Sequence, residues 1–465
     1  MAALLASAVG WGLAAVYHSS ADIVRRRPIV EAWLFAGVLS SLMALIQYAG
    51  ASAFFAPWIN YTEPGIAFAN LRQRNQFATL TNLALASLWW WSVQERSPDR
   101  QANAHGAALL MAVVLAIGNA ASSSRTGLLQ LCLMIGLMAL WGGLRQGLLR
   151  RLWITYGLTY VAALWVLPWA IGLDPWSNGA WARLQAGDAL CSSRLTLWQN
   201  VWHLISLRPW FGWGWGELDY AHFITPYPGA RFCDILDNAH NLPLHLAVEL
   251  GIPAAAFICG LVAWWVVRAK PWRETDPGRQ LAWTVLALIG LHSLLEYPLW
   301  YGPFQMAVGL CVWMLWRRGD APLSAAARLG VRLACGLTAA AMTFACGYVA
   351  WDYHRISQIY LPPEARAAAY RGDTLAKIRG TRLFGSQVDF AELTITPLTP
   401  QNAAHLHGLA QSLLHFSPEP RVIEKLIESA LLLQLNDEAR INLARYRVAF
   451  PEAHDRWATT HRLPF

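Results

Sequence analysis

The stretch Asp237-Asn-Ala-His-Asn-Leu-Pro-Leu-His-Leu-Ala-Val-Glu-Leu-Gly251 decides how this chain is interpreted, because its polar residues open a strongly apolar helix. Such a junction is typical of a segment that enters a membrane from its surface. Ionisable side chains buried beside hydrocarbon cost several kcal/mol, so His240, Asn241 and Glu249 favour a functional site. A helix cap with a satisfied histidine is the alternative for the segment taken alone.

The composition around this stretch is that of a polytopic membrane protein. Hydrophobic residues make up 56% of the 465 residues and charged residues 14%. That is too apolar for one soluble domain and too long for a single span. Apolar windows able to cross about 30 Å of hydrocarbon fall near 1–18, 30–50, 77–93, 104–121, 127–143, 152–172, 243–267, 280–296, 302–316 and 329–350. We therefore expect an all-α membrane bundle with about ten crossings.

The basic residues of the short connections predict the orientation. Arg25 to Arg27, Arg150, Arg268 and Arg317 fall on one side, which should be cytoplasmic in a bacterial inner membrane. The periplasm then receives a long loop, 173–242, and everything after residue 350. This topology puts Met1 in the periplasm without a recognisable signal sequence. We therefore expect further helices upstream, the alternative being a first segment that does not span the membrane.

Two domains follow from the change of character near residue 350. Residues 1–350 form the predicted transmembrane domain, which includes the loop 173–242. Residues 351–465 are more polar and form a predicted periplasmic helical domain, with short amphipathic helices at 401–415, 419–433 and 436–449. These helices are similar to tetratricopeptide repeats, which brace a neighbouring domain or bind a partner.

Cysteine spacing and loop motifs limit the possible cofactors. Cys191 and Cys233 both lie in the long loop, where an oxidising compartment permits a disulfide, although the two thiols can equally lie far apart. The sequence shows no zinc spacing, phosphate-binding glycine loop or dinucleotide fingerprint, so we expect neither a metal nor a cofactor. The net charge of +8 reflects topology, and we infer no nucleic-acid partner from it.

Polar residues on the predicted periplasmic side are candidates for binding an anion. Guanidinium groups bind phosphate oxygens in pairs and stay charged when partly desolvated, which suits a pyrophosphate at a lipid surface. The alternative is a snorkelling side chain or an ion pair with Asp188, Glu217 or Asp237. The candidates are Arg72, Gln73, Asn75 and Gln76 before one helix, Arg125 after a Ser-Ser-Ser turn, and Arg194.

Two histidine–glutamate pairs occur at helical i, i+4 spacing. His292 pairs in this way with Glu296, and His245 with Glu249. Either pair can in principle hold a metal, but two ligands on one helix are weak support and we favour hydrogen-bonded scaffolding. Tyr297 and Tyr301 follow the first pair as possible contacts for an acceptor or a pyrophosphate.

These motifs together resemble the O-antigen ligase and polymerase superfamily over nearly the whole chain. Within it they are most similar to the bacterial protein O-oligosaccharyltransferases that glycosylate pilins and other exported proteins. The family generally carries further N-terminal helices. The motifs are Arg72-Gln-Arg-Asn-Gln-Phe-Ala, Ser124-Arg125, Arg194-x3-Trp198 with Pro209-Trp-Phe-Gly-Trp-Gly, Asp237-Asn-Ala-His240-Asn with Glu249-Leu-Gly, and His292-x3-Glu296-Tyr-Pro.

The resemblance implies transfer of a preassembled oligosaccharide from undecaprenyl-pyrophosphate to a Ser or Thr hydroxyl in the periplasm, without a metal and with inversion. In that reaction His240 accepts the hydroxyl proton, while Arg125 and Arg194, assisted by Arg72, stabilise the leaving pyrophosphate. The partners are the lipid-linked donor, membrane lipid and an exported acceptor protein such as pilin.

Three alternatives remain from the sequence. An O-antigen ligase or polymerase has a lipid-linked acceptor instead of a protein. A transporter can use the same arginines as a gate for an anionic solute, but the spans carry few central charges and no matched pair of broken helices. A scaffold for envelope assembly makes the tail 352–465 the active portion.

Overall fold

The described part of the chain is helical throughout. The structure is a computed structural model that describes residues 22–94, 98–177, 185, 193–316 and 324–460, and this part contains no strand. Five of its helices are long and apolar enough to cross a membrane, and two shorter helices are also apolar. The long segments are Arg27–Tyr48, Ala104–Ser122, Gly147–Ala170, Ile252–Arg273 and Leu329–Tyr360, and the shorter ones are Arg125–Leu140 and Gly302–Trp316. The predicted all-α, polytopic membrane class is confirmed for the described residues, whereas the predicted count of about ten crossings is not reached among them.

The helices divide between two compact units, which are described separately. The bundle unit comprises residues 17–187 and 261–330, and the loop-tail unit comprises 1–16, 188–260 and 331–465. Helices α11 (Ile252–Ala269) and α14 (Ala325–Ser357) contribute residues to both units.

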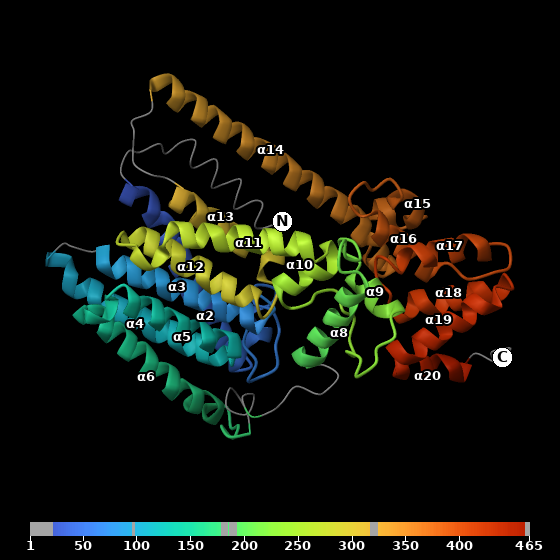
Figure 1. The fold of residues 1–465 in the computed structure, drawn as a ribbon, viewed down its shortest axis with the longest axis horizontal. Coiled ribbons are helices and arrows are strands. Elements are labelled where there is room, and N and C mark those ends of the chain that lie inside the picture. Colours follow the sequence, from blue (N-terminus) through green and yellow to red (C-terminus); the bar gives the residue numbers. More distant parts are fainter. Residues whose placement is uncertain (1–21, 95–97, 178–184, 186–192, 317–323, 461–465) are drawn as a thin grey trace. The chain divides into compact units, whose positions relative to one another are not determined.

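Close packing of small residues defines the bundle unit. Helices α2 (Asp22–Tyr48), α3 (Arg74–Gln94) and α4 (Pro98–Ser122) pack against one another, and α4 also packs on α6 (Gly147–Ala170) (Figure 1). A Cβ added at Gly37 of α2 would lie 2.3 Å from the Cβ of Ala84 on α3, so glycine permits this approach. Helix α5 (Arg125–Leu140) packs on α3 and on α12 (Pro277–Ser293), which in turn packs on α13 (Gly302–Trp316).

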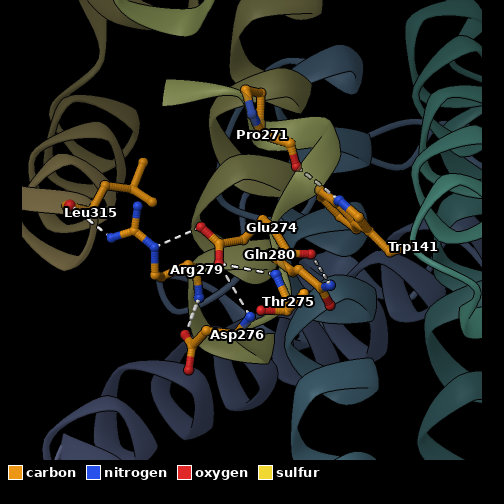
Figure 2. A network of polar contacts seen from close by, with 8 residues as sticks. All are labelled: Trp141, Pro271, Glu274, Thr275, Asp276, Arg279, Gln280 and Leu315. Carbon is orange, nitrogen blue, oxygen red and sulfur yellow. Dashed lines mark hydrogen bonds and ion pairs between the residues drawn. The ribbon is translucent and has the colours of Figure 1, made fainter. Parts of the chain in front are cut away.

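A polar network fixes the turn between α11 and α12 within the bundle unit (Figure 2). The Glu274 carboxylate accepts a hydrogen bond from Arg279 Nε at 2.6 Å, and Arg279 Nη1 donates to the Leu315 carbonyl at 2.8 Å. Trp141 Nε1 donates to the Pro271 carbonyl at 2.9 Å. A cavity of about 220 Å³ adjoins the network, and its lining includes none of the predicted site residues. The network joins this turn to Trp141, just after α5, and to Leu315 of α13.

Four helices of the loop-tail unit carry the central motifs. They are α8 (Arg194–Leu207), α9 (Leu218–Ile224), α10 (Leu242–Leu250) and the first half of α11. Helix α8 packs on α9 and α10 through a core that includes Leu197, Val201, Leu204 and Val248. The predicted single span 243–267 is wrong, because α10 ends at Leu250 and α11 begins at Ile252. Gly251 separates the two helices with a φ of +87°, which suits glycine.

Short amphipathic helices form the rest of this unit. The three predicted segments are confirmed as α17 (Ala403–Leu413), α18 (Pro420–Leu432) and α19 (Asn436–Ala449), and they are flanked by α16 (Gly385–Ile395) and α20 (Pro451–Thr460). Consecutive helices pack on one another around buried residues such as Leu406, Leu426 and Tyr446. The predicted window 1–18 lies outside the described residues.

Candidate active site

His240 lies immediately before α10 in a backbone conformation that few side chains adopt. Its φ is +50°, in the left-handed region, where histidine is rare but tolerated better than bulky residues. Its N–H donates to Asn238 Oδ1 at 2.9 Å, and Trp198 Nε1 donates to the preceding carbonyl, of Ala239, at 3.1 Å. Backbone strain of this kind concentrates at functional sites. The imidazole is half-buried, and hydrogen bonds to the His240 N–H and the Ala239 carbonyl hold the backbone that carries it.

The next residue, Asn241, is the N-cap of α10. Its Oδ1 accepts a hydrogen bond from Leu244 N at 3.1 Å, and Pro243 occupies the first turn, where its missing N–H costs nothing. The sequence alternative of a helix cap is therefore correct for Asn241, and it leaves His240 outside the helix.

Arg194 is the first residue of α8, and Trp198 of this helix is hydrogen-bonded to Ala239, the residue before His240. Ser193 caps this helix by accepting from Thr196 N at 3.1 Å. Trp198 comes one turn after Arg194, so the two residues share a helix face. Because Trp198 bonds to Ala239, the Arg194-x3-Trp198 motif connects an arginine-bearing helix start with the residue beside His240.

His245 and Glu249 form a buried pair on α10. Each side chain is about 2–3% exposed, and His245 Nε2 lies 3.5 Å from Glu249 Oε2. Burial raises the pKa of Glu249 to about 7 and lowers the pKa of His245 to about 4, so both groups favour their uncharged forms. The main chain of Glu249 also accepts from Gly214 N at 3.0 Å. A scaffolding role for this pair remains a prediction.

In the bundle unit, the predicted polar segment starts α3. Gln73 Oε1 accepts from Gln76 N at 2.7 Å and so caps the helix. Arg72 stands just before this cap, exposed, with a left-handed φ of +59°. Gln73 and Gln76 therefore shape the helix start, and Arg72 is presented beside it.

Asn75 connects three parts of the bundle unit. Its amide donates to Glu296 Oε1 at 3.1 Å, and its Oδ1 accepts from Ser124 Oγ at 2.6 Å. One turn later, Thr79 Oγ1 lies 2.8 Å from His292 Nδ1. The side chains of His292 and Glu296 thus contact two residues of one α3 face. Helix α12 ends at Ser293, so Glu296 lies beyond the predicted shared helix, although its N–H still donates to the His292 carbonyl at 2.8 Å.

Arg125 is the first residue of α5 and is exposed. Ser124 caps α5 by accepting from Gly127 N at 3.0 Å, while its hydroxyl donates to Asn75. That bond joins the α5 start, which bears Arg125, to the α3 start, which follows Arg72. Helix starts carry partial positive charge, so two arginines and two helix N-termini make this part of the bundle unit favourable for an anion.

The two predicted tyrosines lie after α12 in the same unit. The rings of Tyr297 and Tyr301 stack with centroids 6.0 Å apart and 22° between their planes. Both are half-buried, and Tyr301 packs against the hydrophobic core. A role for either ring in binding substrate remains a prediction.

Sequence reasoning missed a buried polar chain inside the bundle. Gln130 Nε2 donates to Thr79 Oγ1 at 2.9 Å, Asn82 Nδ2 to Gln130 Oε1 at 2.9 Å, and Asn119 Nδ2 to Asn82 Oδ1 and Tyr156 Oη at 2.9 Å each. Buried polar groups need hydrogen-bond partners, so this series of hydrogen bonds fixes the positions of α3, α4, α5 and α6 relative to one another. Polar residues at 75, 79 and 82 of one α3 face were the available signal.

Sequence reasoning also missed the contact between α9 and the tail. Phe223 of α9 is 3% exposed and belongs to the core of α16 to α20. His415 Nδ1 lies 2.6 Å from Glu217 Oε2, and its ring stacks on Tyr220 with centroids 3.9 Å apart. Burial, with some contribution from nearby carboxylates, raises the pKa of Asp219 to about 7. The tail therefore packs against α9 and the residue just before it.

The remaining predictions concern a disulfide and a metal. Cys191, and with it the pairing to Cys233, lies outside the described residues, as does Asp188. Glu217, a suggested ion partner for an arginine, instead pairs with His415. Across residues 22–460 as described, no group of three or more His, Cys, Asp and Glu side chains is arranged to hold a metal ion.

Three family models match successive parts of the chain. The protein glycosylation ligase model matches residues 67–91, which include Arg72 and Asn75. The O-antigen ligase model matches 106–259, which include Arg125, Arg194 and His240. The C-terminal model of virulence factor membrane-bound polymerases matches 280–463.

Two curated relatives from Acinetobacter baylyi are similar to the chain. A general O-oligosaccharyltransferase is 25% identical over 324 residues, covering 64% of this chain and 52% of the relative. A ComP-specific O-oligosaccharyltransferase is 26% identical over 287 residues, covering 60% of this chain and 50% of the relative. The chain thus spans about half the length of each of these relatives.

No solved structure matches the chain. The matched segments follow one another in the order of the motifs, and each contains residues that the sequence predicts for the site. Residues 106–259 of the chain thus match the O-antigen ligase family and residues 67–91 the protein glycosylation ligase family, and both of these relatives are O-oligosaccharyltransferases.

Proposed function

We propose that the protein is a glycosyltransferase, a protein O-oligosaccharyltransferase of the bacterial inner membrane. It transfers a preassembled oligosaccharide from undecaprenyl-pyrophosphate to Ser or Thr hydroxyls of an exported protein such as pilin. The observation that carries the proposal is the conformation of His240, which is held outside α10 beside the helix that Arg194 begins. The relatives, both O-oligosaccharyltransferases, support the same reaction.

In this proposal His240 is the general base. A Ser or Thr hydroxyl is a poor nucleophile near neutral pH, and an imidazole is well suited to accept its proton. The hydroxyl oxygen forms a bond to the anomeric carbon as the bond from that carbon to the pyrophosphate oxygen breaks. One displacement of this kind inverts the anomeric configuration.

Arg125, Arg194 and Arg72 bind the donor pyrophosphate. The leaving group departs as an anion and needs positive charge more than a proton. Each of these arginines stands at or beside a helix start, where backbone N–H groups add to the attraction. In the bundle unit, the supporting residues around Arg72 and Arg125 are Asn75, Glu296 and His292. On α10, the supporting residues are Asn241, which caps the helix, and Glu249, which lies beside His245.

The proposal assigns residues 1–350 to a transmembrane catalytic domain and 351–465 to a periplasmic helical domain. The active face, including 173–242, then lies on the periplasmic side. The proposed chemistry needs neither a metal nor a cofactor.

A second candidate is an O-antigen ligase or polymerase. The match of residues 106–259 to the O-antigen ligase model and of 280–463 to the polymerase model favours it. The same base and arginines serve that reaction, with a lipid-linked sugar as acceptor.

Co-expression with a lipid-linked glycan pathway and a candidate pilin separates these functions. The intact mass of the pilin is measured with the wild type, with His240→Ala and with His203→Ala as the matched control on α8. We expect a glycan-sized increment with the wild type and the control only. Modified lipopolysaccharide beside an unmodified pilin would select the ligase, and an increment that persists in His240→Ala would remove His240 as the base.

A further inference from the structure

Aromatic side chains are exposed on one segment of the loop-tail unit. The segment Pro209-Trp-Phe-Gly-Trp-Gly-Trp-Gly216, named here the aromatic loop, follows α8 directly. Trp210 is 71% exposed, Phe211 89% and Trp215 64%. Trp202 on α8 is 63% exposed. Each such side chain buries about 150–250 Å² when covered, so leaving four in water is unfavourable.

The aromatic loop is a fixed structure that presents these side chains. Trp213 N donates to the Val248 carbonyl at 2.9 Å, and Ile252 N donates to the Pro209 carbonyl at 2.8 Å. Gly212 and Gly251 let the two backbones touch, since a Cβ on Gly212 would lie 2.3 Å from the Glu249 carbonyl oxygen. The exposed rings are therefore held outward by a backbone bonded to the end of α10.

The exposed surface continues onto a membrane span. The bond from Ile252 places the aromatic loop beside the start of α11, and only 6% of the residues in the 18-residue apolar window of the segment Ile252–Arg273 are buried. Phe257 in the first turns of α11 is 67% exposed. Indole rings beside the end of a span favour the headgroup layer of a bilayer.

Charge supports a lipid environment over a protein partner. The aromatic loop contains no charged residue, whereas Arg208 just before it places its guanidinium 4.1 Å from the centroid of the Trp213 ring. An arginine beside a tryptophan suits the level of lipid phosphates, because its stem stays apolar while its head remains hydrated.

We propose that the aromatic loop and Trp202 are inserted into the headgroup layer of the membrane, in contact with phospholipid. The loop is bonded to α10, so this insertion sets the depth of the segment that begins with His240. Resting on the proposed function, it holds His240 at the level of a lipid-bound pyrophosphate. The loop is thus a membrane-binding surface additional to the spans.

Photocross-linking in the full-length protein tests this surface without donor or acceptor. The photoreactive residue p-benzoyl-phenylalanine replaces Phe211, or Phe416 in the tail as the matched control, which is 39% exposed. After illumination in native membranes, the protein mass is measured for covalent adducts. A second position, Trp210, is included in case the first variant does not accumulate.

We expect phospholipid adducts at 211 and 210 at least tenfold more abundant than at 416. Protein adducts at 211, an isoprenoid adduct, or no excess over 416 would overturn the membrane-binding surface. A phospholipid adduct in a chain that transfers no glycan would keep this surface and reject the proposed function, so the two failures are distinguishable.

Discussion

Replacement of His240 by glycine separates the backbone role of this residue from its chemical role. The left-handed conformation costs an L residue about 1–2 kcal/mol, whereas glycine adopts it freely. Glycine also loses about 0.5–1 kcal/mol more chain entropy on folding. His240→Gly should therefore change the free energy of unfolding by about 0 to 1.5 kcal/mol in the stabilising direction.

The same substitution removes the proposed base. A general base contributes about 10² to 10⁴ in rate, which corresponds to about 2.7–5.4 kcal/mol of activation free energy. The matched control is His203→Gly in the middle of α8, where glycine costs about 0.5–1 kcal/mol of stability and touches no proposed catalytic group. The two variants should show opposite signatures.

Thermal unfolding in detergent, followed by tryptophan fluorescence, and the rate of glycan transfer are measured on both variants. We expect His240→Gly to unfold no earlier than the wild type and to transfer at least 100-fold more slowly. His203→Gly should unfold earlier and keep its activity. Transfer by His240→Gly above a tenth of the wild-type rate would refute the base, and early unfolding would refute the backbone argument.

Three further substitutions test the scaffold by thermal unfolding. Gly251→Ala should cost at least about 2 kcal/mol, since its Cβ would lie 2.2 Å from the Trp210 carbonyl oxygen at a φ of +87°, while Gly260→Ala meets nothing within 4 Å and should be nearly neutral; equal effects would contradict this. Asp219→Asn should flatten the dependence of the unfolding temperature on pH. Because the folded-state pKa of Asp219 is raised to about 7, its contribution to stability is complete below about pH 4 and is lost as the pH rises through 7, so an unchanged slope in the variant would reject it. Phe223→Ala should cost about 3–5 kcal/mol by opening the tail core, and a loss below about 1 kcal/mol would show that the tail does not brace α9.

The effect of Asp219→Asn is the difference between the variant and the wild type in how the unfolding temperature depends on pH. Burial lowers the pKa of His222 to about 3 and that of His245 to about 4. The contribution of these two groups to the free energy of unfolding therefore increases as the pH rises. Their contribution is present in both proteins and cancels. The remaining difference reports the Asp219 carboxyl together with its effect on Glu249, whose pKa burial raises to about 7 with a smaller contribution from Asp219.

Hydrophobic patterning predicted the helices well where burial of apolar side chains was the dominant effect. Most of the long apolar windows within the described residues became helices, and the three amphipathic tail segments ended within a few residues of their predicted limits. The window 243–267 failed because hydropathy does not register backbone conformation. Gly251 with its positive φ divides that window, and the division is what leaves the aromatic loop bonded to both α10 and α11.

Site residues were predictable as types but their contacts were not. Spacing suggested that His292 and Glu296 share a helix face, whereas the structure attaches them to Thr79 and Asn75 of α3. Such pairings join segments more than two hundred residues apart, and no local pattern encodes them. The link from His415 to Glu217 was inaccessible for the same reason.

The central claim is tested most directly by single-turnover transfer with purified protein in proteoliposomes that contain the lipid-linked donor. Bound donor and glycosylated acceptor are quantified for the wild type, His240→Asn and Arg194→Ala, asparagine being tolerant of the left-handed conformation. We predict that His240→Asn retains the donor and transfers at least 100-fold more slowly, while Arg194→Ala loses donor retention. Transfer at the wild-type rate by His240→Asn would contradict the account.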